Sequence, residues 1–233
     1  MEHFSYTTDE NVAIVTMDSG ENRFNYEFFE QFHKLLDELE QIDNLNVLVV
    51  KSSHEKIWSN GIDLEWIATN MEKDGPGFFE EFAVEMYRLF NRILTYPMIT
   101  FAAITGHAFA GGAIMSCAFD YRYMRDDRGW FCFPEIDIKI PFTPFLNAIA
   151  LKAIPIRKLN QMQLTGERLT AEECLNAGII RKICTLDSMI PEILEYAKTL
   201  VKDKEMIKKM KAELFSDIVQ ICKDELAKHN KSL

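Results

Sequence analysis

Apolar residues follow two different spacings along this chain. Short continuous apolar runs predict strands buried on both faces, whereas apolar residues three and four positions apart predict helices with one buried face. Strands that alternate with helices predict βαβ units, and therefore an α/β fold with a largely parallel sheet. The expected strands span residues 12–17, 45–50, 98–104, 121–124 and 130–133, and the expected helices span residues 26–42, 63–70, 78–94 and 112–119.

Polar and helix-breaking residues mark the expected ends of these elements. Asn25 and Asp63 each precede a helical pattern, and both side chains can accept hydrogen bonds from the free N–H groups of a first helical turn. Glycine and proline interrupt helices and favour turns. Other expected breaks are Pro97, the loop at 73–77 around Gly75-Pro76-Gly77, and the polar turn at 125–129.

The pattern changes near residue 145. Residues 1–144 alternate strands with helices and form the expected core, whereas residues 145–233 are expected to be mostly helical. Within this C-terminal helical region, residues 198–211 are rich in lysine and amphipathic. This spacing predicts a helix whose lysines face solvent.

Composition narrows the classes of function. Of 233 residues, 48% are hydrophobic and 27% are charged, which is typical of a globular protein, and the net charge of −10 disfavours nucleic acid as a partner. No apolar run approaches 18 residues, and residues 1–20 lack a signal peptide. The terminal Lys231-Ser232-Leu233 differs from the peroxisomal targeting tripeptide Ser-Lys-Leu. We therefore expect no membrane contact and a cytoplasmic location. The five scattered cysteines contain no Cys-x-x-Cys pair, so we expect reduced thiols and no metal.

Two glycine-centred turns are the candidate site. The first, residues 59–64, follows the expected strand 45–50, and the second, residues 104–113, connects a strand to a buried helix. Small residues let a backbone pass close to a ligand, and a helix start leaves N–H groups free. Two such junctions predict a two-donor oxyanion hole.

The turns and two further blocks resemble the crotonase, or enoyl-CoA hydratase/isomerase, superfamily. The resemblance covers roughly residues 5–200, and its blocks occur in the family's order and spacing. They are Ser59-Asn60-Gly61-Ile62-Asp63-Leu64; Thr105-Gly106-His107-Ala108 through Gly111-Gly112 and on to Arg122; Phe133-Pro134-Glu135; and Leu164-Thr165-Gly166 through Ala171, with Ala177-Gly178-Ile179-Ile180.

The resemblance implies a fold, an assembly and a set of roles. The implied fold is a crotonase-type spiral of ββα repeats with a C-terminal helical trimerisation region, so a homotrimer or hexamer is expected, with the apolar residues of 146–164 partly at the interface. The implied substrate is an acyl-CoA thioester, with no cofactor beyond its coenzyme A. The implied catalytic groups are Glu135 and the N–H groups of Ile62 and Gly111, and the implied substrate-binding residues are Arg23, Asn60, Gly61, His107, Gly112, Ile114 and Phe142.

Departures from the family pattern point to one reaction. Hydratases of this family carry a first catalytic glutamate where this chain has Ile114, and a Gly-Gly-Thr-Gln-like segment where it has the bulky residues 140–145. The pattern that remains, with Glu135 as the one retained glutamate, is similar to that of the Δ3,Δ2-enoyl-CoA isomerases. One carboxylate can remove a proton at C2 and return it at C4, and burial should raise its pKa and strengthen it as a base.

Several alternatives stay open at this point. Asp137 is a second acid/base candidate, and Asp120 is expected to form hydrogen bonds rather than to catalyse. Arg23 is the candidate for the coenzyme A phosphates, because Glu65 stands where many relatives carry a basic residue. The apolar residues of 78–90 are expected mainly to pack the core, with an acyl tunnel as the alternative. Other functions that fit are a decarboxylase or weak hydratase on a thioester, or a non-catalytic acyl-CoA binder.

Overall fold

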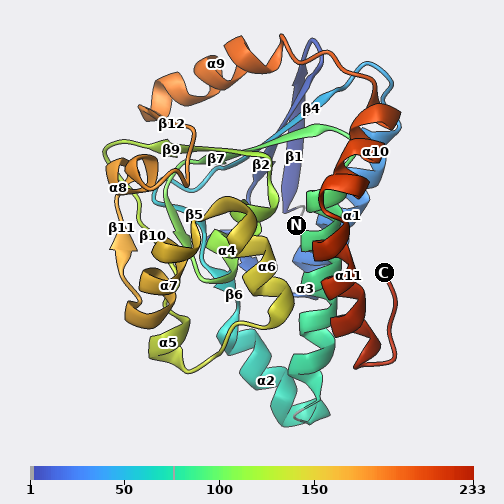
Figure 1. Ribbon diagram of the computed structural model, residues 1–233, viewed down its shortest axis with the longest axis vertical. Helices are drawn as coiled ribbons and strands as arrows, with labels where there is room; N and C mark the ends of the chain where they lie inside the picture. Colours follow the sequence, from blue (N-terminus) through green and yellow to red (C-terminus); the bar gives the residue numbers. More distant parts are fainter. Residues whose placement is uncertain (1–2, 76) are drawn as a thin grey trace.

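A twisted, mostly parallel sheet is the central layer of the computed structural model, which describes residues 3–75 and 77–233 (Figure 1). Strands β2, β4, β7, β9 and β12 run parallel, and β1 closes one edge as the antiparallel partner of β2. All five predicted strands are present, although β4 begins at residue 47 rather than 45. The six strands, in spatial order, are β1 (Phe4–Asp9), β2 (Val12–Met17), β4 (Val47–Ser52), β7 (Ile99–Ile104), β9 (Tyr121–Arg125) and β12 (Lys182–Cys184).

A second, smaller sheet and a short strand pair lie at the site. Their strands have only two or three residues, which is too short for any periodicity to reveal, so most of them were not predictable. The small sheet contains, in spatial order, β11 (Arg168–Leu169), β10 (Phe131–Cys132), β8 (His107–Phe109) and β5 (Ile57–Ser59), and the parallel pair is β3 (Arg23–Phe24) with β6 (Gly61–Ile62).

The predicted N-terminal helices form where the apolar spacing placed them. In α1 (Tyr26–Glu40) the Asn25 side chain accepts a hydrogen bond from the Phe28 N–H at 2.8 Å, and in α2 (Leu64–Asp74) Asp63 caps Trp66 at 3.1 Å. Helix α2 continues through the start of the expected loop at 73–77, and Pro76 of that loop lies outside the described residues. Helix α3 (Phe78–Thr95) ends just before Pro97, as predicted.

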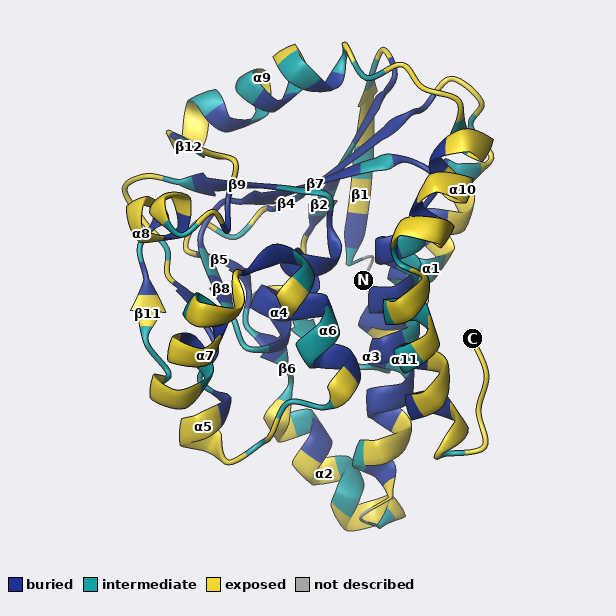
Figure 2. Cartoon of the chain, viewed as in Figure 1, coloured by how far each residue is buried: buried dark blue, intermediate teal, exposed yellow. Residues whose placement is uncertain are grey.

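Helix α4 (Gly111–Ala118) is buried along its whole length (Figure 2). A buried helix end needs partners for its last carbonyls. Lys152 donates hydrogen bonds to the carbonyls of residues 117–119, and Arg122 donates to those of residues 116 and 119. These two cations hold the C-terminal end of α4, so its N-terminal end is fixed facing the site.

The C-terminal region is mostly helical, but it is also part of the core. Strand β12 belongs to the six-stranded sheet, and β11 belongs to the smaller sheet. Helix α11 packs against α3 and α6. The helices are α5 (Glu135–Ile138), α6 (Pro144–Ala153), α7 (Ile156–Thr165), α8 (Ala171–Asn176), α9 (Leu186–Ala197), α10 (Lys204–Leu214) and α11 (Ser216–Ala227).

The lysine-rich stretch departs from its predicted exposure. Lys211 on α10 is buried; its ammonium lies 2.6 Å from an Asp120 oxygen and donates to the Met98 carbonyl. Asp120 also accepts hydrogen bonds from the N–H and hydroxyl of Thr100, so it has the hydrogen-bonding role that was expected. The prediction that these lysines all face solvent is wrong for Lys211, because the partly buried Asp120 carboxylate and the Met98 carbonyl replace the water that the ammonium loses.

Within the described ranges, no helix is long and apolar enough to cross a membrane, and no cluster of His, Cys, Asp and Glu side chains could hold a metal ion. All five cysteines are free and buried. Burial raises the pKa of each of these thiols above its ordinary value.

Candidate active site

Glu135 is a buried carboxylate with an unsatisfied oxygen. It lies at the start of α5, where the chain turns after β10, and its residue is only 9% exposed. No hydrogen-bond partner for its Oε2 atom occurs among residues 3–75 and 77–233. Burial penalises the ionised form and raises the pKa of Glu135 to about 7. A carboxyl group with this pKa can both accept and return a proton near neutral pH.

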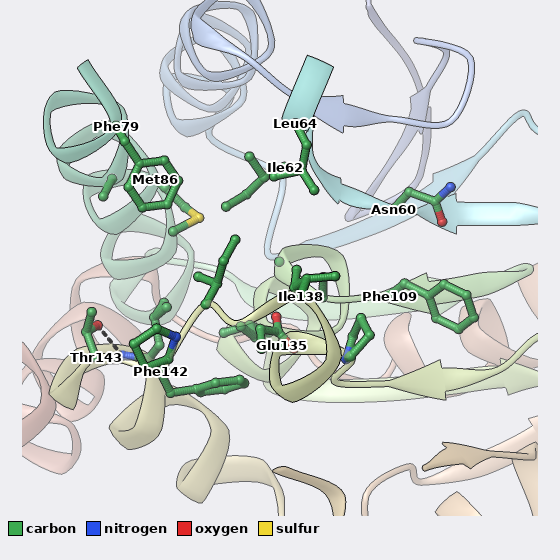
Figure 3. A pocket seen from close by; sticks show the side chains of 18 of the residues that line it. Asn60, Ile62, Leu64, Phe79, Met86, Phe109, Glu135, Ile138, Phe142 and Thr143 are labelled. Carbon is green, nitrogen blue, oxygen red and sulfur yellow. Dashed lines mark hydrogen bonds between the residues drawn. The ribbon is translucent and has the colours of Figure 1, made fainter. Parts of the chain in front are cut away.

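The carboxylate faces a mostly apolar cavity of about 240 Å³, here called the inner cavity. In Figure 3, Glu135 lies in the middle, with Asn60 and Phe109 toward one end and Phe79, Met86, Phe142 and Thr143 toward the other. The lining comprises Arg23, Asn60, Ile62, Leu64, Phe79, Ala83, Met86, Tyr87, Phe109, Ala110, Gly111, Ile114, Pro134, Glu135, Ile138, Ile140, Pro141, Phe142, Thr143 and Leu146.

The backbone N–H groups of Ile62 and Gly111 are the candidate oxyanion donors at this cavity. The Asp63 N–H donates to the Phe24 carbonyl across the β3–β6 pair. Because N–H directions alternate along a strand, the N–H of Ile62 points away from β3. Gly111 is the first residue of α4, where an N–H has no partner within the helix. Both residues line the inner cavity, as a two-donor oxyanion site requires.

Ala110, directly before Gly111, has a strained backbone. Its φ of 50° and ψ of −128° lie in a region that L-residues rarely adopt, which costs on the order of 1–3 kcal/mol. Two hydrogen bonds maintain this conformation. The Ala110 N–H donates to the Cys132 carbonyl, and the Ala110 carbonyl accepts from the Ile114 N–H, both at 3.0 Å. The strained turn aims the α4 N-terminus into the cavity.

Glycines bring the two turns into contact. A Cβ atom on Gly61 would lie 2.6 Å from the Gly111 nitrogen, and one on Gly112 would lie 2.4 Å from the Ser59 carbonyl oxygen. The φ of Gly61, +72°, is also a left-handed conformation that favours glycine. Both glycines therefore set the spacing of the site without lining it.

The structure gathers most, but not all, of the predicted site residues. Arg23, Asn60, Ile62, Gly111, Ile114, Glu135 and Phe142 line the inner cavity, whereas Gly61, Gly112 and His107 do not. The Nδ1 atom of His107 accepts the Trp130 N–H at 3.1 Å, so the ring positions the neighbouring loop instead of facing the cavity. Asp137 is exposed and also lies outside the lining.

Helix α3 supplies a wall that sequence analysis placed mainly in the core. Phe79, Ala83, Met86 and Tyr87 line the inner cavity, and their spacing puts them on one face of the helix. Other side chains of α3, such as the fully buried Phe82 and Phe90, pack the core as predicted. The periodicity revealed an apolar helix but could not show which part of its face lies beside empty space.

Glu21 is a nearby charged residue that sequence analysis missed. Its Oε2 atom lies 2.6 Å from an Arg23 nitrogen and accepts the Asn60 amide at 2.9 Å. These hydrogen bonds, first from Asn60 and then from Arg23, lower the pKa of Glu21. Arg23, the candidate for phosphate contact, is therefore paired with a carboxylate at the polar end of the site.

The sequence also matches the profile of the enoyl-CoA hydratase/isomerase family over residues 7–231. The chain belongs to this family. Among relatives, it is 28% identical over 201 residues to enoyl-CoA delta isomerase 2, peroxisomal, of Arabidopsis thaliana, covering 85% of this chain and 82% of that protein. It is also 28% identical over 210 residues to carnitinyl-CoA dehydratase of Escherichia coli K12, covering 86% of this chain and 75% of that protein.

Solved structures of the enoyl-CoA hydratase/isomerase family have the same fold. One Mycobacterium tuberculosis protein, described as an enoyl-CoA isomerase in one structure and as a probable enoyl-CoA hydratase in another, superposes with a TM-score of 0.85 at 20% identity; 96% of this chain and 96% or 92% of that chain are covered. An enoyl-CoA hydratase from Bacillus halodurans superposes with a TM-score of 0.84 at 20% identity, covering 96% of this chain and 92% of that one. The predicted crotonase-type fold is confirmed, and at this identity the structural likeness concerns the fold alone.

Proposed function

We propose that this protein is an enoyl-CoA isomerase that moves a C3 double bond of an acyl-CoA thioester to C2. The observation that carries the proposal is the environment of Glu135: it is the one carboxylate lining the inner cavity within the described chain, and its Oε2 atom has no partner there. Membership of the family supports a thioester substrate, and relatives named enoyl-CoA delta isomerase support the reaction.

The proposed mechanism is a proton shuttle. Ionised Glu135 removes a proton from C2, and the electrons of that C–H bond move into the thioester to give a dienolate whose charge rests on the thioester oxygen. The N–H groups of Ile62 and Gly111 stabilise that oxygen. Protonated Glu135 then returns the proton to C4, which places the double bond at C2. The reaction consumes no water and transfers no net electrons, so it needs no cofactor beyond the coenzyme A of the substrate.

Hydration and dehydration of a thioester are competing possibilities, because proteins similar to this chain are named carnitinyl-CoA dehydratase and enoyl-CoA hydratase. Each of these two reactions needs a polar group that holds the water. Ile114 lines the cavity where a second glutamate would be expected, and it is 2% exposed and apolar. Among the described residues, the lining of the inner cavity therefore offers hydration no second carboxylate, whereas isomerisation requires only one.

Product analysis tests the proposal. Purified protein is incubated separately with a 3-enoyl-CoA and with a 2-enoyl-CoA, and the products are separated by chromatography. We expect conversion between the two double-bond isomers without 3-hydroxyacyl-CoA. Formation of the hydroxy product as the main species would instead establish a hydratase, and binding without turnover of either substrate would establish an acyl-CoA binder.

The isomerisation rate should rise with pH. Only the ionised Glu135 can accept the C2 proton, and burial raises the pKa of Glu135 to about 7. We therefore expect kcat/KM to increase through neutral pH, with a midpoint near 7, and to level off above it. A rate profile measured from pH 5 to 9 checks this; a midpoint near the ordinary pKa of glutamate would contradict the proposed environment.

Removing the Glu21 charge should strengthen coenzyme A binding. In Glu21→Gln, the Arg23 guanidinium loses its anionic partner and becomes available to a phosphate group. Because both side chains are partly exposed, we expect only about a two- to fivefold lower Kd, and a smaller effect in high salt. Calorimetry with coenzyme A measures the change, and Glu30→Gln on the exposed face of α1 serves as the control for net charge.

We also propose that the protein assembles as a homotrimer or hexamer through its C-terminal helices. Within residues 146–164, Leu151, Ile156 and Leu164 are 46%, 67% and 65% exposed, and burying such apolar side chains against a second copy would stabilise an assembly. Sedimentation at micromolar concentration should show the trimer or hexamer, and Ile156→Glu should shift it toward smaller species. A wild-type monomer would contradict this assembly.

A further inference from the structure

The two ends of the inner cavity differ in polarity, and this difference indicates which end receives the acyl chain. This inference rests on the proposed function, which places the thioester oxygen at the N–H groups of Ile62 and Gly111. The polar end holds Asn60, as Figure 3 shows, and suits the coenzyme A side. From the thioester, the acyl chain must therefore run toward the apolar end, between α3 and the segment that follows α5.

The apolar end is closed by buried side chains. Met86 and Tyr87 on α3 are only 3% and 4% exposed. The Tyr87 hydroxyl donates to the Thr143 hydroxyl at 3.2 Å, which ties α3 to the residue that caps α6. These contacts bound the apolar end of the inner cavity, so they limit how far an acyl chain can extend there.

A second cavity lies directly behind one wall of the first. This outer cavity, of about 420 Å³, shares Glu135, Ile140, Pro141 and Phe142 with the inner cavity. Its remaining lining includes the rim residues Ile136 and Leu164, which are 49% and 65% exposed, so it opens at the surface of the single protomer.

Phe142 supplies the bulk of this shared wall. Its ring packs edge to face on Phe133, with the ring centroids 5.2 Å apart, and Pro141 restricts the backbone that precedes it. Ile140 is the other large side chain of the wall.

We propose that Phe142 is a specificity-determining residue that limits this protein to short acyl chains, because its ring separates the two cavities. Without the Phe142 ring, the inner cavity joins the outer one, and a longer chain can pass through the opening toward the surface. Ile136 offers a matched comparison, because it lines the outer cavity but not the inner one. Truncating Ile136 enlarges the outer cavity without joining the two.

The test measures binding of saturated acyl-CoAs, which need no catalysis. Hexanoyl-CoA and dodecanoyl-CoA are titrated calorimetrically into wild-type protein, Phe142→Ala and Ile136→Ala. We expect the wild type to bind hexanoyl-CoA at least about tenfold more tightly, Phe142→Ala to bind dodecanoyl-CoA at least as tightly as hexanoyl-CoA, and Ile136→Ala to keep the wild-type order. Equal wild-type affinities, or an unchanged order in Phe142→Ala, would overturn the proposal.

Two additions keep the outcome interpretable. Phe142→Leu, which retains an apolar side chain, should shift the preference in the same direction by a smaller factor if Phe142→Ala does not fold. An isomerase assay with 3-hexenoyl-CoA and 3-dodecenoyl-CoA runs in parallel. Absence of turnover with both would refute the proposed function while the binding order still tests the role of Phe142; turnover with no dependence on chain length would refute only that role.

Discussion

Replacing Glu135 with Gln should reduce isomerisation by about 10²–10⁴-fold or more, because the amide keeps the shape of the carboxylate but cannot accept the C2 proton. Binding of acyl-CoA should change little, since the oxyanion donors are backbone groups and the rest of the cavity is mostly apolar. Turnover of a 3-enoyl-CoA and calorimetric binding of a saturated acyl-CoA separate the two effects. The control is Asp137→Asn, two residues away and exposed.

The same substitution should make the protein more stable at high pH. The folded-state pKa of Glu135 is about 7, above the ordinary value of 4.5. Between these values the folded chain binds more protons than the unfolded chain, so this group's contribution to stability falls as pH rises. Glu135→Gln removes the ionisation, and we expect a gain on the order of 1–3 kcal/mol at pH 8 that disappears below pH 4. Denaturant unfolding at both pH values measures it.

Near-wild-type turnover in Glu135→Gln would show that the single-carboxylate mechanism is wrong. Asp137, which is exposed and outside the cavity lining, would then be the next acid/base group to test. A loss of turnover without the stability gain would indicate that Glu135 is more solvated than its burial implies.

Replacing Gly61 with Ala should disable the oxyanion site. The new methyl group would lie 2.6 Å from the Gly111 nitrogen, a backbone atom that can move only by separating the two turns. Loss of one oxyanion donor typically costs about 10²–10³ in rate, and we expect at least that loss in kcat together with a lower melting temperature. Steady-state kinetics and thermal denaturation measure these effects.

Gly178→Ala is the matched control for Gly61→Ala. Gly178 has almost the same φ, +73° against +72°, but nothing lies within 4 Å of its Cβ position. Both variants therefore introduce the same backbone strain, and only Gly61→Ala adds the collision. Equal losses of activity in the two variants would contradict the close contact of the two turns as the cause.

Sequence alone determined the elements whose apolar spacing is long enough to read. Strands β2, β4, β7 and β9 and helices α1, α3 and α4 each bury a continuous run or one helical face, so their side-chain pattern records their environment. Capping by Asn25 and Asp63 was also predictable, because it depends on a local hydrogen bond. The family resemblance identified Glu135, Ile62 and Gly111, which the structure gathers at one cavity.

Tertiary structure decided everything that depends on contacts between distant residues. Strands of two or three residues such as β3 and β6 exist because a neighbouring backbone pairs with them, and no local pattern specifies that pairing. Burial of Lys211 beside Asp120 and the place of His107 outside the cavity each follow from partners far apart in the sequence.

The division has one physical reason. A side chain's polarity is written in the sequence, but the amount of water left around it is set by the packing of the whole chain. Sequence therefore indicated that Glu135 is a carboxylate at a candidate site, and the fold removed its solvent and raised its pKa to about 7. In the same way, sequence showed that Phe142 is large and apolar, whereas only the packed structure placed its ring between two cavities.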